Sequence, residues 1–234
     1  MSDTFHSLFI DNVNRQHYHL MPSGEASQPV HVVIWPTYSG LTDFEKSIAD
    51  KVASLGYSVT AVDLYGPDCV LESADEKLSL MGKLVENSAP LHSLQRTLID
   101  ASMADIHDKS IVHIGFCLGG RLALEAGLHF SDSVGAASFH GLMSFNRATK
   151  EQVNPDLKIM VFNGHNDPLV SPESCQSAKQ YWTELALDFQ FIDFGNTVHS
   201  FMMPSANNPD HGSMYNPQVA KRSYVYLENF LAEF

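Results

Sequence analysis

Short apolar runs alternate with amphipathic stretches from Val30 to the end of the chain. Most of the apolar runs are rich in Val, Ile or Phe and too short for helices, which is typical of buried strands. The stretches between them have helical spacing, and this alternation predicts an α/β fold, with a mostly parallel sheet and helices on both faces. The expected strands cover His31–Trp35, Ser58–Leu64, Ile111–Phe116, Val134–Phe139, Ile159–Asn163 and Phe189–Phe194, and the expected helices cover Asp43–Leu55, Leu118–His129, Pro172–Leu187 and Pro217–Ala232.

Two other segments are less regular. Residues 72–108 predict two helices broken near Pro90, placed where they would form a wall or cap over a site. Residues 15–20 alternate in character and predict an edge strand ahead of the main sheet. His17 and His19 would point to one face of that strand, and because no third histidine or acidic partner is apparent nearby, we expect solvated histidines rather than a metal site.

Length and charge narrow the class of protein. The 234 residues are few enough for one hydrophobic core, so we expect a single domain over residues 1–234. A formal charge of −13 would repel a nucleic-acid backbone and an anionic membrane surface, so we expect neither as a partner. The first basic residue is Arg15 and no apolar run is long enough to cross a bilayer, which favours the cytoplasm. Without a long heptad pattern, a monomer is the default expectation.

The chain has three cysteines, Cys69, Cys117 and Cys175. Their odd number and wide, unequal spacing fit neither a disulfide framework nor a paired Cys-x-x-Cys metal site. At least one of them is therefore expected to be a free thiol. Of the three, Cys117 lies in the most informative sequence context.

Cys117 follows an apolar strand within Gly115-Phe-Cys-Leu-Gly119-Gly120, and a helical stretch begins directly after it. This is the pattern of a nucleophile elbow with Cys in place of Ser. The turn is so tight that the nucleophile adopts a strained conformation and glycines are needed beside it. The pattern predicts a nucleophilic thiol at the carboxyl edge of the sheet, whereas a small buried cysteine is the ordinary alternative.

The elbow also predicts an oxyanion hole. The N–H of Leu118 lies at a helix N-terminus, where unpaired N–H groups and the helix dipole favour a thiolate and a developing oxyanion. A second donor is expected from the loop after the strand that ends at Trp35, and the N–H of Tyr38 is our choice.

In such folds the acid and the histidine follow the nucleophile along the chain, each after a later strand. Asp167 follows the strand that ends at Asn163, and His199 follows the strand that ends at Phe194, so both would emerge at the edge that carries Cys117. His140 and His165 are alternative bases, but both fit the lining of a pocket better than the place of the triad histidine.

These residues resemble the dienelactone hydrolase family of α/β-hydrolases. The resemblance extends from the Gly-Phe-Cys-Leu-Gly-Gly elbow to residues 56–66, 138–141, 164–170, 198–201 and the tail from Tyr215, and so covers most of the chain. It implies an α/β-hydrolase fold and a triad of Cys117, Asp167 and His199 that needs no metal or organic cofactor.

Two positions depart from the family pattern. The resemblance implies a glutamate that contacts the thiol from the loop after the first core strand, where this chain has Thr37. It also implies an arginine for a substrate carboxylate shortly after the catalytic histidine, where this chain has Met203. Because an anionic substrate would lose a bidentate partner, we expect a neutral or more apolar ester or lactone. Thr37, His140 and Met203 are the expected lining of the substrate pocket.

The expected reaction is acyl transfer from a small ester or lactone to the Cys117 thiolate, followed by hydrolysis. A thioesterase or acyltransferase could use the same triad, and a thiol redox sensor could use the same fold without turnover. These alternatives stay open at the level of sequence.

Overall fold

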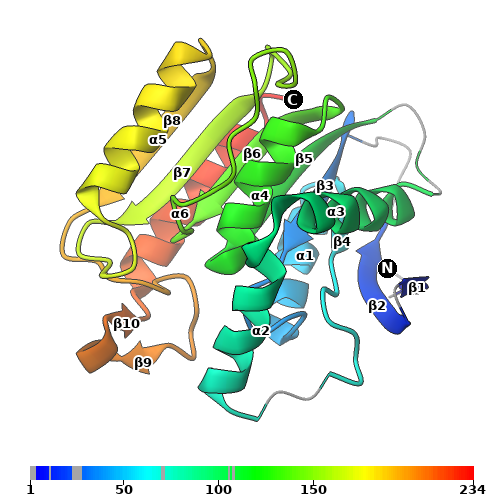
Figure 1. The fold of residues 1–234 in the computed structure, drawn as a ribbon, viewed down its shortest axis with the longest axis horizontal. Coiled ribbons are helices and arrows are strands. Elements are labelled where there is room, and N and C mark those ends of the chain that lie inside the picture. The colour runs from blue at the N-terminus through cyan, green and yellow to red at the C-terminus, as the bar shows by residue number, and fades with distance from the viewer. Residues whose placement is uncertain (1–3, 11, 23–27, 70–71, 105, 107–108) are drawn as a thin grey trace.

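A computed structural model describes residues 4–10, 12–22, 28–69, 72–104, 106 and 109–234. An eight-stranded sheet runs through the molecule in the order β1-β2-β4-β3-β5-β6-β7-β8 (Figure 1). The six strands β3 to β8 are parallel to one another. Strands β1 and β2 pair antiparallel with each other, and β2 pairs antiparallel with β4. The strands are β1 Thr4–Ile10, β2 Val13–Leu20, β3 Val30–Trp35, β4 Ser58–Ala61, β5 Ser110–Phe116, β6 Ser133–Phe139, β7 Lys158–Gly164 and β8 Asp188–Phe194.

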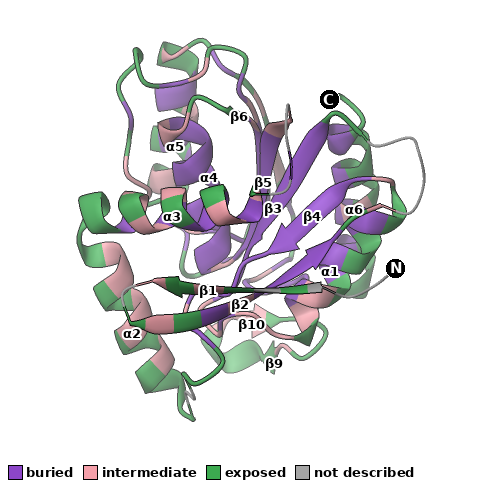
Figure 2. Cartoon of the chain, turned by 90° about the vertical axis from the view of Figure 1, so that its right-hand side faces the viewer, coloured by how far each residue is buried: buried purple, intermediate pink, exposed green. Residues whose placement is uncertain are grey.

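Helices cover both faces of this sheet, as expected for the α/β class. Helices α1 and α6 pack on one face, and α3, α4 and α5 pack on the other (Figures 1 and 2). The central strand β3 is buried at every position, because both of its faces are covered. The helices are α1 Asp43–Ser54, α2 Ala74–Glu86, α3 Ser88–Ser102, α4 Leu118–His129, α5 Pro172–Glu184 and α6 Pro217–Leu231, and a small β9 (Asn207–Asn208), η1 (Pro209–His211) and β10 (Ser213–Met214) unit precedes α6.

The register of the parallel strands brings their carboxyl ends to one edge. Trp35 pairs with Gly115, Phe116 pairs with Phe139, and Gly164 pairs with Phe194, so the loops after β3, β5, β7 and β8 all leave the sheet on the same side. In open α/β sheets this is the edge at which ligands bind.

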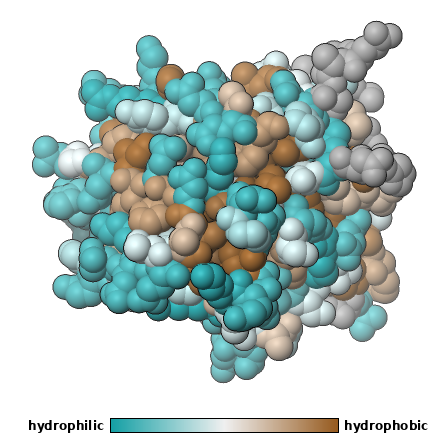
Figure 3. Space-filling model, turned by 90° about the horizontal axis from the view of Figure 1, so that it is seen from above, coloured by the Kyte–Doolittle hydropathy of each residue, from teal (hydrophilic) through white to brown (hydrophobic). Residues whose placement is uncertain are grey.

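The opposite edge carries the amino ends of the parallel strands. The C-terminus lies there (Figure 1), where Lys158 at the start of β7 bonds Glu233 at 2.9 Å. Seen from above, this side of the molecule is mostly hydrophilic, with brown hydrophobic areas between the polar side chains (Figure 3).

The N-terminal hairpin differs from the expectation of an edge strand with solvated histidines. Strand β1 pairs with β2 from Val13 to His19, so β1 and not β2 forms the edge of the sheet. His17 and His19 are 0% and 3% exposed, and the expectation that they are solvated was wrong. Nδ1 of His17 accepts the N–H of Asp63, and Nδ1 of His19 lies 2.8 Å from the Thr60 hydroxyl, so both rings serve the packing of β2 against β4.

The segment after β4 also differs. The strand ends at Ala61 rather than at Leu64, because the Asp63 carboxylate accepts the N–H groups of Tyr65 and Gly66 and turns the chain. The two expected helices of residues 72–108 are confirmed as α2 and α3, with the break at Asn87, which is the N-cap of α3. Pro90 lies in the first turn of α3, where a missing N–H is tolerated. Helix α2 buries none of its residues (Figure 2).

No helix in the described part of the chain is both long and apolar enough to cross a membrane. The expectations of a single domain and of a cytoplasmic location stay predictions.

Buried histidines make the stability of the fold sensitive to acid. Burial, with the charge of Arg96, lowers the pKa of His113 from 6.5 to about 3, and burial lowers the pKa of His31 well below 6.5. Below pH 6.5 the unfolded chain binds protons that the folded chain does not, so stability falls as the pH falls. Each such histidine contributes a slope of about 1.4 kcal/mol per pH unit.

We therefore expect the free energy of unfolding, measured by urea titration between about pH 6 and pH 4, to fall with acidification. In a His113→Gln variant, the slope of the unfolding free energy against pH should be smaller by about 1.4 kcal/mol per pH unit, which is the contribution of one proton. An equal slope in the two proteins would contradict this assignment to His113.

Candidate active site

Cys117 lies at the junction of β5 and α4 in an unusual backbone conformation. Its φ and ψ are 55° and −116°, and a non-glycine residue held there carries about 1–3 kcal/mol of strain. The surroundings hold it in place, because the N–H of Cys117 donates to the Phe139 carbonyl at 3.1 Å and its own carbonyl accepts the Gly120 N–H at 3.1 Å. This is the geometry expected of a nucleophile elbow, and the thiol is partly exposed and free of any disulfide.

Two glycines make this turn possible. A Cβ atom on Gly115 would collide with the Gly119 carbonyl and lie 2.7 Å from the Gly120 nitrogen. A Cβ atom on Gly119 would collide with the Trp35 carbonyl and lie 2.6 Å from the carbonyl oxygen of Pro36. The glycines therefore let the start of α4 approach both β5 and the loop after β3, which is the loop expected to provide the second oxyanion donor.

In the loop of residues 36–40, nearly all backbone N–H groups donate to other groups of the protein. Pro36 has none, the Thr37 N–H donates to the Glu45 carboxylate at 3.1 Å, and the N–H groups of Ser39 and Gly40 donate to the Thr37 hydroxyl and carbonyl at 3.3 and 3.0 Å. Among the described residues, the Tyr38 N–H has no acceptor. It is therefore the N–H of residues 37–40 that remains for a ligand.

The Leu118 N–H is available for a different reason. Leu118 is the first residue of α4, and the first N–H groups of a helix have no carbonyl partner within it. Positive potential at this end of the helix favours negative charge beside it. Counting only the described residues, the N–H groups of Tyr38 and Leu118 are thus without acceptors, one on each of the two segments that the elbow glycines bring together.

His199 and Asp167 form a buried hydrogen-bonded pair. Nδ1 of His199 lies 2.7 Å from Oδ2 of Asp167, and the two side chains are 6% and 0% exposed. The other carboxylate oxygen accepts the Leu169 N–H at 2.9 Å. The backbone of His199 is fixed as well, because its N–H donates to the Gly212 carbonyl and its carbonyl accepts the Met214 N–H.

The charge state of His199 is set by its neighbours. Burial alone lowers the pKa of the imidazole, but hydrogen bonding to Asp167 and the interaction with the Cys117 thiol raise it to about 10. At neutral pH this favours the protonated, imidazolium form of His199. Nε2 of His199 is buried and makes no hydrogen bond of ordinary geometry among the described residues, so it is free to exchange a proton with a bound ligand.

His140 lies directly beside this pair. Its ring is fully buried at a positive φ of 39°, 5.1 Å from the rings of both His199 and Phe201. Burial, with the positive charge of His199, lowers its pKa well below 6.5, so His140 is neutral. Neither ring nitrogen has a hydrogen-bond partner within the described residues. The alternative base His165 is instead 65% exposed and pairs with Asp193 at 3.1 Å.

The other two expected pocket residues differ in accessibility. Thr37 is fully buried, with its hydroxyl turned to the Ser39 N–H, so its side chain offers no open surface. Met203 is partly exposed, and its N–H donates to the Ser200 carbonyl at 2.9 Å.

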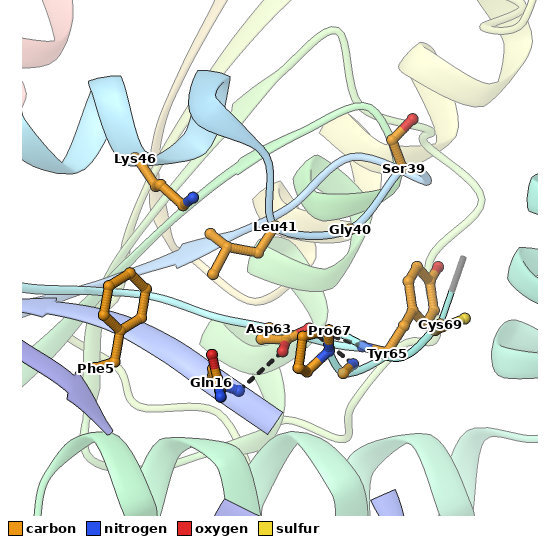
Figure 4. A pocket seen from close by; sticks show the side chains of 11 residues that line it. Phe5, Gln16, Ser39, Gly40, Leu41, Lys46, Asp63, Tyr65, Pro67 and Cys69 are labelled. Carbon is orange, nitrogen blue, oxygen red and sulfur yellow. Dashed lines mark hydrogen bonds between the residues drawn. The ribbon is translucent and has the colours of Figure 1, made fainter. Parts of the chain in front are cut away.

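Tyr65 is a neighbour of the site that we did not predict. Burial and then the charges of Cys69 and Cys117 raise the pKa of its phenol, and its hydroxyl is buried without a partner among the described residues. The ring lines a cavity of about 200 Å³ beside Ser39 and Gly40 (Figure 4) and also a wider groove of about 580 Å³ under α2. A tyrosine two residues after Asp63 gave no local signal of this placement.

No three His, Cys, Asp or Glu side chains gather as a metal site in the described ranges.

Comparison with known proteins agrees with this architecture. The model of the dienelactone hydrolase family matches residues 16–234. The chain belongs to the dienelactone hydrolase family. This confirms the resemblance, the α/β-hydrolase fold and the expected class, a hydrolase of ester bonds related to the carboxymethylenebutenolidases.

Individual relatives are distant. A protein of Aquifex aeolicus (strain VF5), provisionally named carboxymethylenebutenolidase, is 25% identical over 86% of this chain and 84% of its own length. The solved structure of a protein called m3DLH is 25% identical, and that of a dienelactone hydrolase-like promiscuous phosphotriesterase from metagenomic libraries is 24% identical. Each covers 98% of both chains with a TM-score of 0.86.

The raised pKa of His199 is directly testable by NMR of its imidazole. We expect the ring to remain protonated at pH 8 and to titrate near pH 10. Removal of the thiol in Cys117→Ala, or of the carboxylate charge in Asp167→Asn, should lower this pKa, because each group stabilises the imidazolium. Titration of the wild-type ring near its ordinary value, unchanged in both variants, would refute the proposed coupling.

Proposed function

We propose that this chain hydrolyses a small carboxylic ester or lactone by acyl transfer through Cys117, with His199 as the proton carrier and Asp167 as its orienting partner. The observation that carries the proposal is the strained Cys117 turn at the same sheet edge as the 2.7 Å His199–Asp167 hydrogen bond. A thiol in a strained turn at a helix N-terminus, coupled to an oriented histidine, is the arrangement that nucleophilic catalysis requires.

In the first half of the reaction, the Cys117 thiolate attacks the carbonyl carbon. The carbonyl oxygen gains the negative charge, which the N–H groups of Leu118 and Tyr38 stabilise. The tetrahedral intermediate then collapses, and the carbon–oxygen bond of the ester breaks. The His199 imidazolium gives its proton to the departing alkoxide, leaving a thioester on Cys117 and a neutral imidazole.

In the second half, water attacks the thioester. Neutral His199 removes a proton from the water as it adds to the carbonyl carbon, and the same two N–H groups stabilise the oxyanion again. Loss of the thiolate releases the carboxylic acid and restores the imidazolium–thiolate pair. Asp167 keeps the Nδ1 proton in place throughout, so that Nε2 faces the reacting groups.

Two positions near this edge of the sheet offer no free cation to a substrate carboxylate. Met203 offers no charge, and Arg121, one turn into α4, is bound to the buried Glu125 carboxylate at 2.7 Å. Three further bonds, from His92 and from the backbone and side chain of Asn146, complete the coordination of Glu125. Arg121 is therefore committed to the protein interior rather than available to a substrate carboxylate.

The test is a comparison of the wild type with Cys117→Ala on a panel of activated neutral esters, lactones and carboxylate-bearing analogues. We expect turnover by the wild type, an acyl adduct of the corresponding mass, and loss of activity by at least about 10³-fold in the variant. Faster turnover of thioesters would point to the thioesterase alternative. Equal rates in the two proteins would refute the proposal, and oxidation of Cys117 without any acylation would favour a redox role.

A further inference from the structure

Glu45 is a fully buried carboxylate in the first turn of α1. Its Oε2 accepts the Thr42 N–H at 2.9 Å and the Thr42 hydroxyl, which closes the capping box of the helix. Its Oε1 leaves the helix and accepts the Thr37 N–H at 3.1 Å, in the loop that carries Tyr38. One carboxylate thus binds both the helix cap and the loop of residues 36–40.

A second capping box in the same molecule shows what the cap alone requires. In α2, Glu76 accepts the N–H groups of Ser73 and Glu72 through one oxygen, Oε2, and the residue is exposed. A capping glutamate therefore needs neither burial nor a bond to a distant loop. Because burying a carboxylate is costly unless it is fully hydrogen-bonded, the burial of Glu45 calls for a role beyond capping.

The bond to Thr37 determines the course of the loop. With its N–H held by Glu45, Thr37 accepts the Ser39 N–H on its hydroxyl and the Gly40 N–H on its carbonyl. The Tyr38 peptide lies between these anchored groups. Lys46, the next residue of α1, lines the cavity beside Ser39 and Gly40 and points into it (Figure 4), whereas Glu45 is fully buried.

We propose that Glu45 is a positioning residue for the oxyanion hole, and that its carboxylate acts through Thr37 to fix the direction of the Tyr38 N–H. This inference rests on the proposed function, because it requires an oxyanion to form at Cys117. Glu45 touches no reacting atom. Its removal should slow the steps in which negative charge develops on the carbonyl oxygen, with little change in the binding of the uncharged ester.

Glu45→Leu keeps much of the side-chain volume and removes both acceptors. We expect kcat for an activated ester to fall by about 10- to 100-fold, with KM within about threefold of the wild type, because a misdirected donor weakens transition-state binding alone. Glu45→Gln can still accept the Thr37 N–H on its amide oxygen, so kcat should remain within about fivefold of the wild type.

Two matched variants separate positioning from capping. Thr42→Ala weakens the cap of α1 and removes the hydroxyl bond to Glu45 Oε2, but it leaves the Thr42 N–H on Oε2 and the Thr37 N–H on Oε1. Glu76→Leu removes the corresponding glutamate from α2. Both should lower thermal stability while kcat stays within about twofold of the wild type. If Glu45→Leu does not fold, Glu45→Ala replaces it in the same assay, and a kcat for Glu45→Ala within about twofold of the wild type would overturn the proposal.

The outcomes are distinguishable from failure of the proposed function. Inactive Cys117→Ala together with fully active Glu45→Leu would overturn the role of Glu45 and leave the function intact. Inactive Cys117→Ala with a selective loss of kcat in Glu45→Leu supports both. Full activity of Cys117→Ala would overturn both.

Discussion

The site depends on one constraint, the left-handed turn that Cys117 makes between β5 and α4. An L-residue adopts such a conformation only where its surroundings enforce it, and here the enforcing contacts are hydrogen bonds to Phe139 and Gly120. The turn needs glycine at 115 and 119, and the lack of side chains there brings the loop after β3 against the start of α4. The thiol and both expected oxyanion donors are thus consequences of the same backbone geometry.

The remaining parts of the site are fixed by bonds that leave few groups unpaired. Within the described residues, every N–H of the loop of residues 36–40 except that of Tyr38 has an acceptor, and Nε2 of His199 makes no hydrogen bond of ordinary geometry. Groups that are fixed in advance cost no reorganisation when charge develops on a ligand. Burial of the site also lowers the pKa of His140, so that this ring stays neutral beside the imidazolium of His199.

The sequence predicts the parallel part of the sheet and the site residues at its edge, because buried strands and elbow glycines leave strong local signals. It does not predict contacts between segments. His17 and His19 are buried with partners more than 40 residues away, the Asp63 N–H and the Thr60 hydroxyl. Strand β4 stops early because the Asp63 side chain takes over backbone N–H groups. Thr42-x-x-Glu45 is a readable capping pattern, but the bond from Glu45 to Thr37 in the loop of residues 36–40 arises only in the folded chain.

The most direct test of this account is a crystal structure of the protein with an aldehyde bound covalently to Cys117 as a hemithioacetal. The account predicts that the oxygen derived from the carbonyl lies within about 3 Å of the N–H groups of both Leu118 and Tyr38, with His199 Nε2 near the adduct. An adduct whose oxygen points to solvent, or whose sulfur lies away from His199, would contradict it.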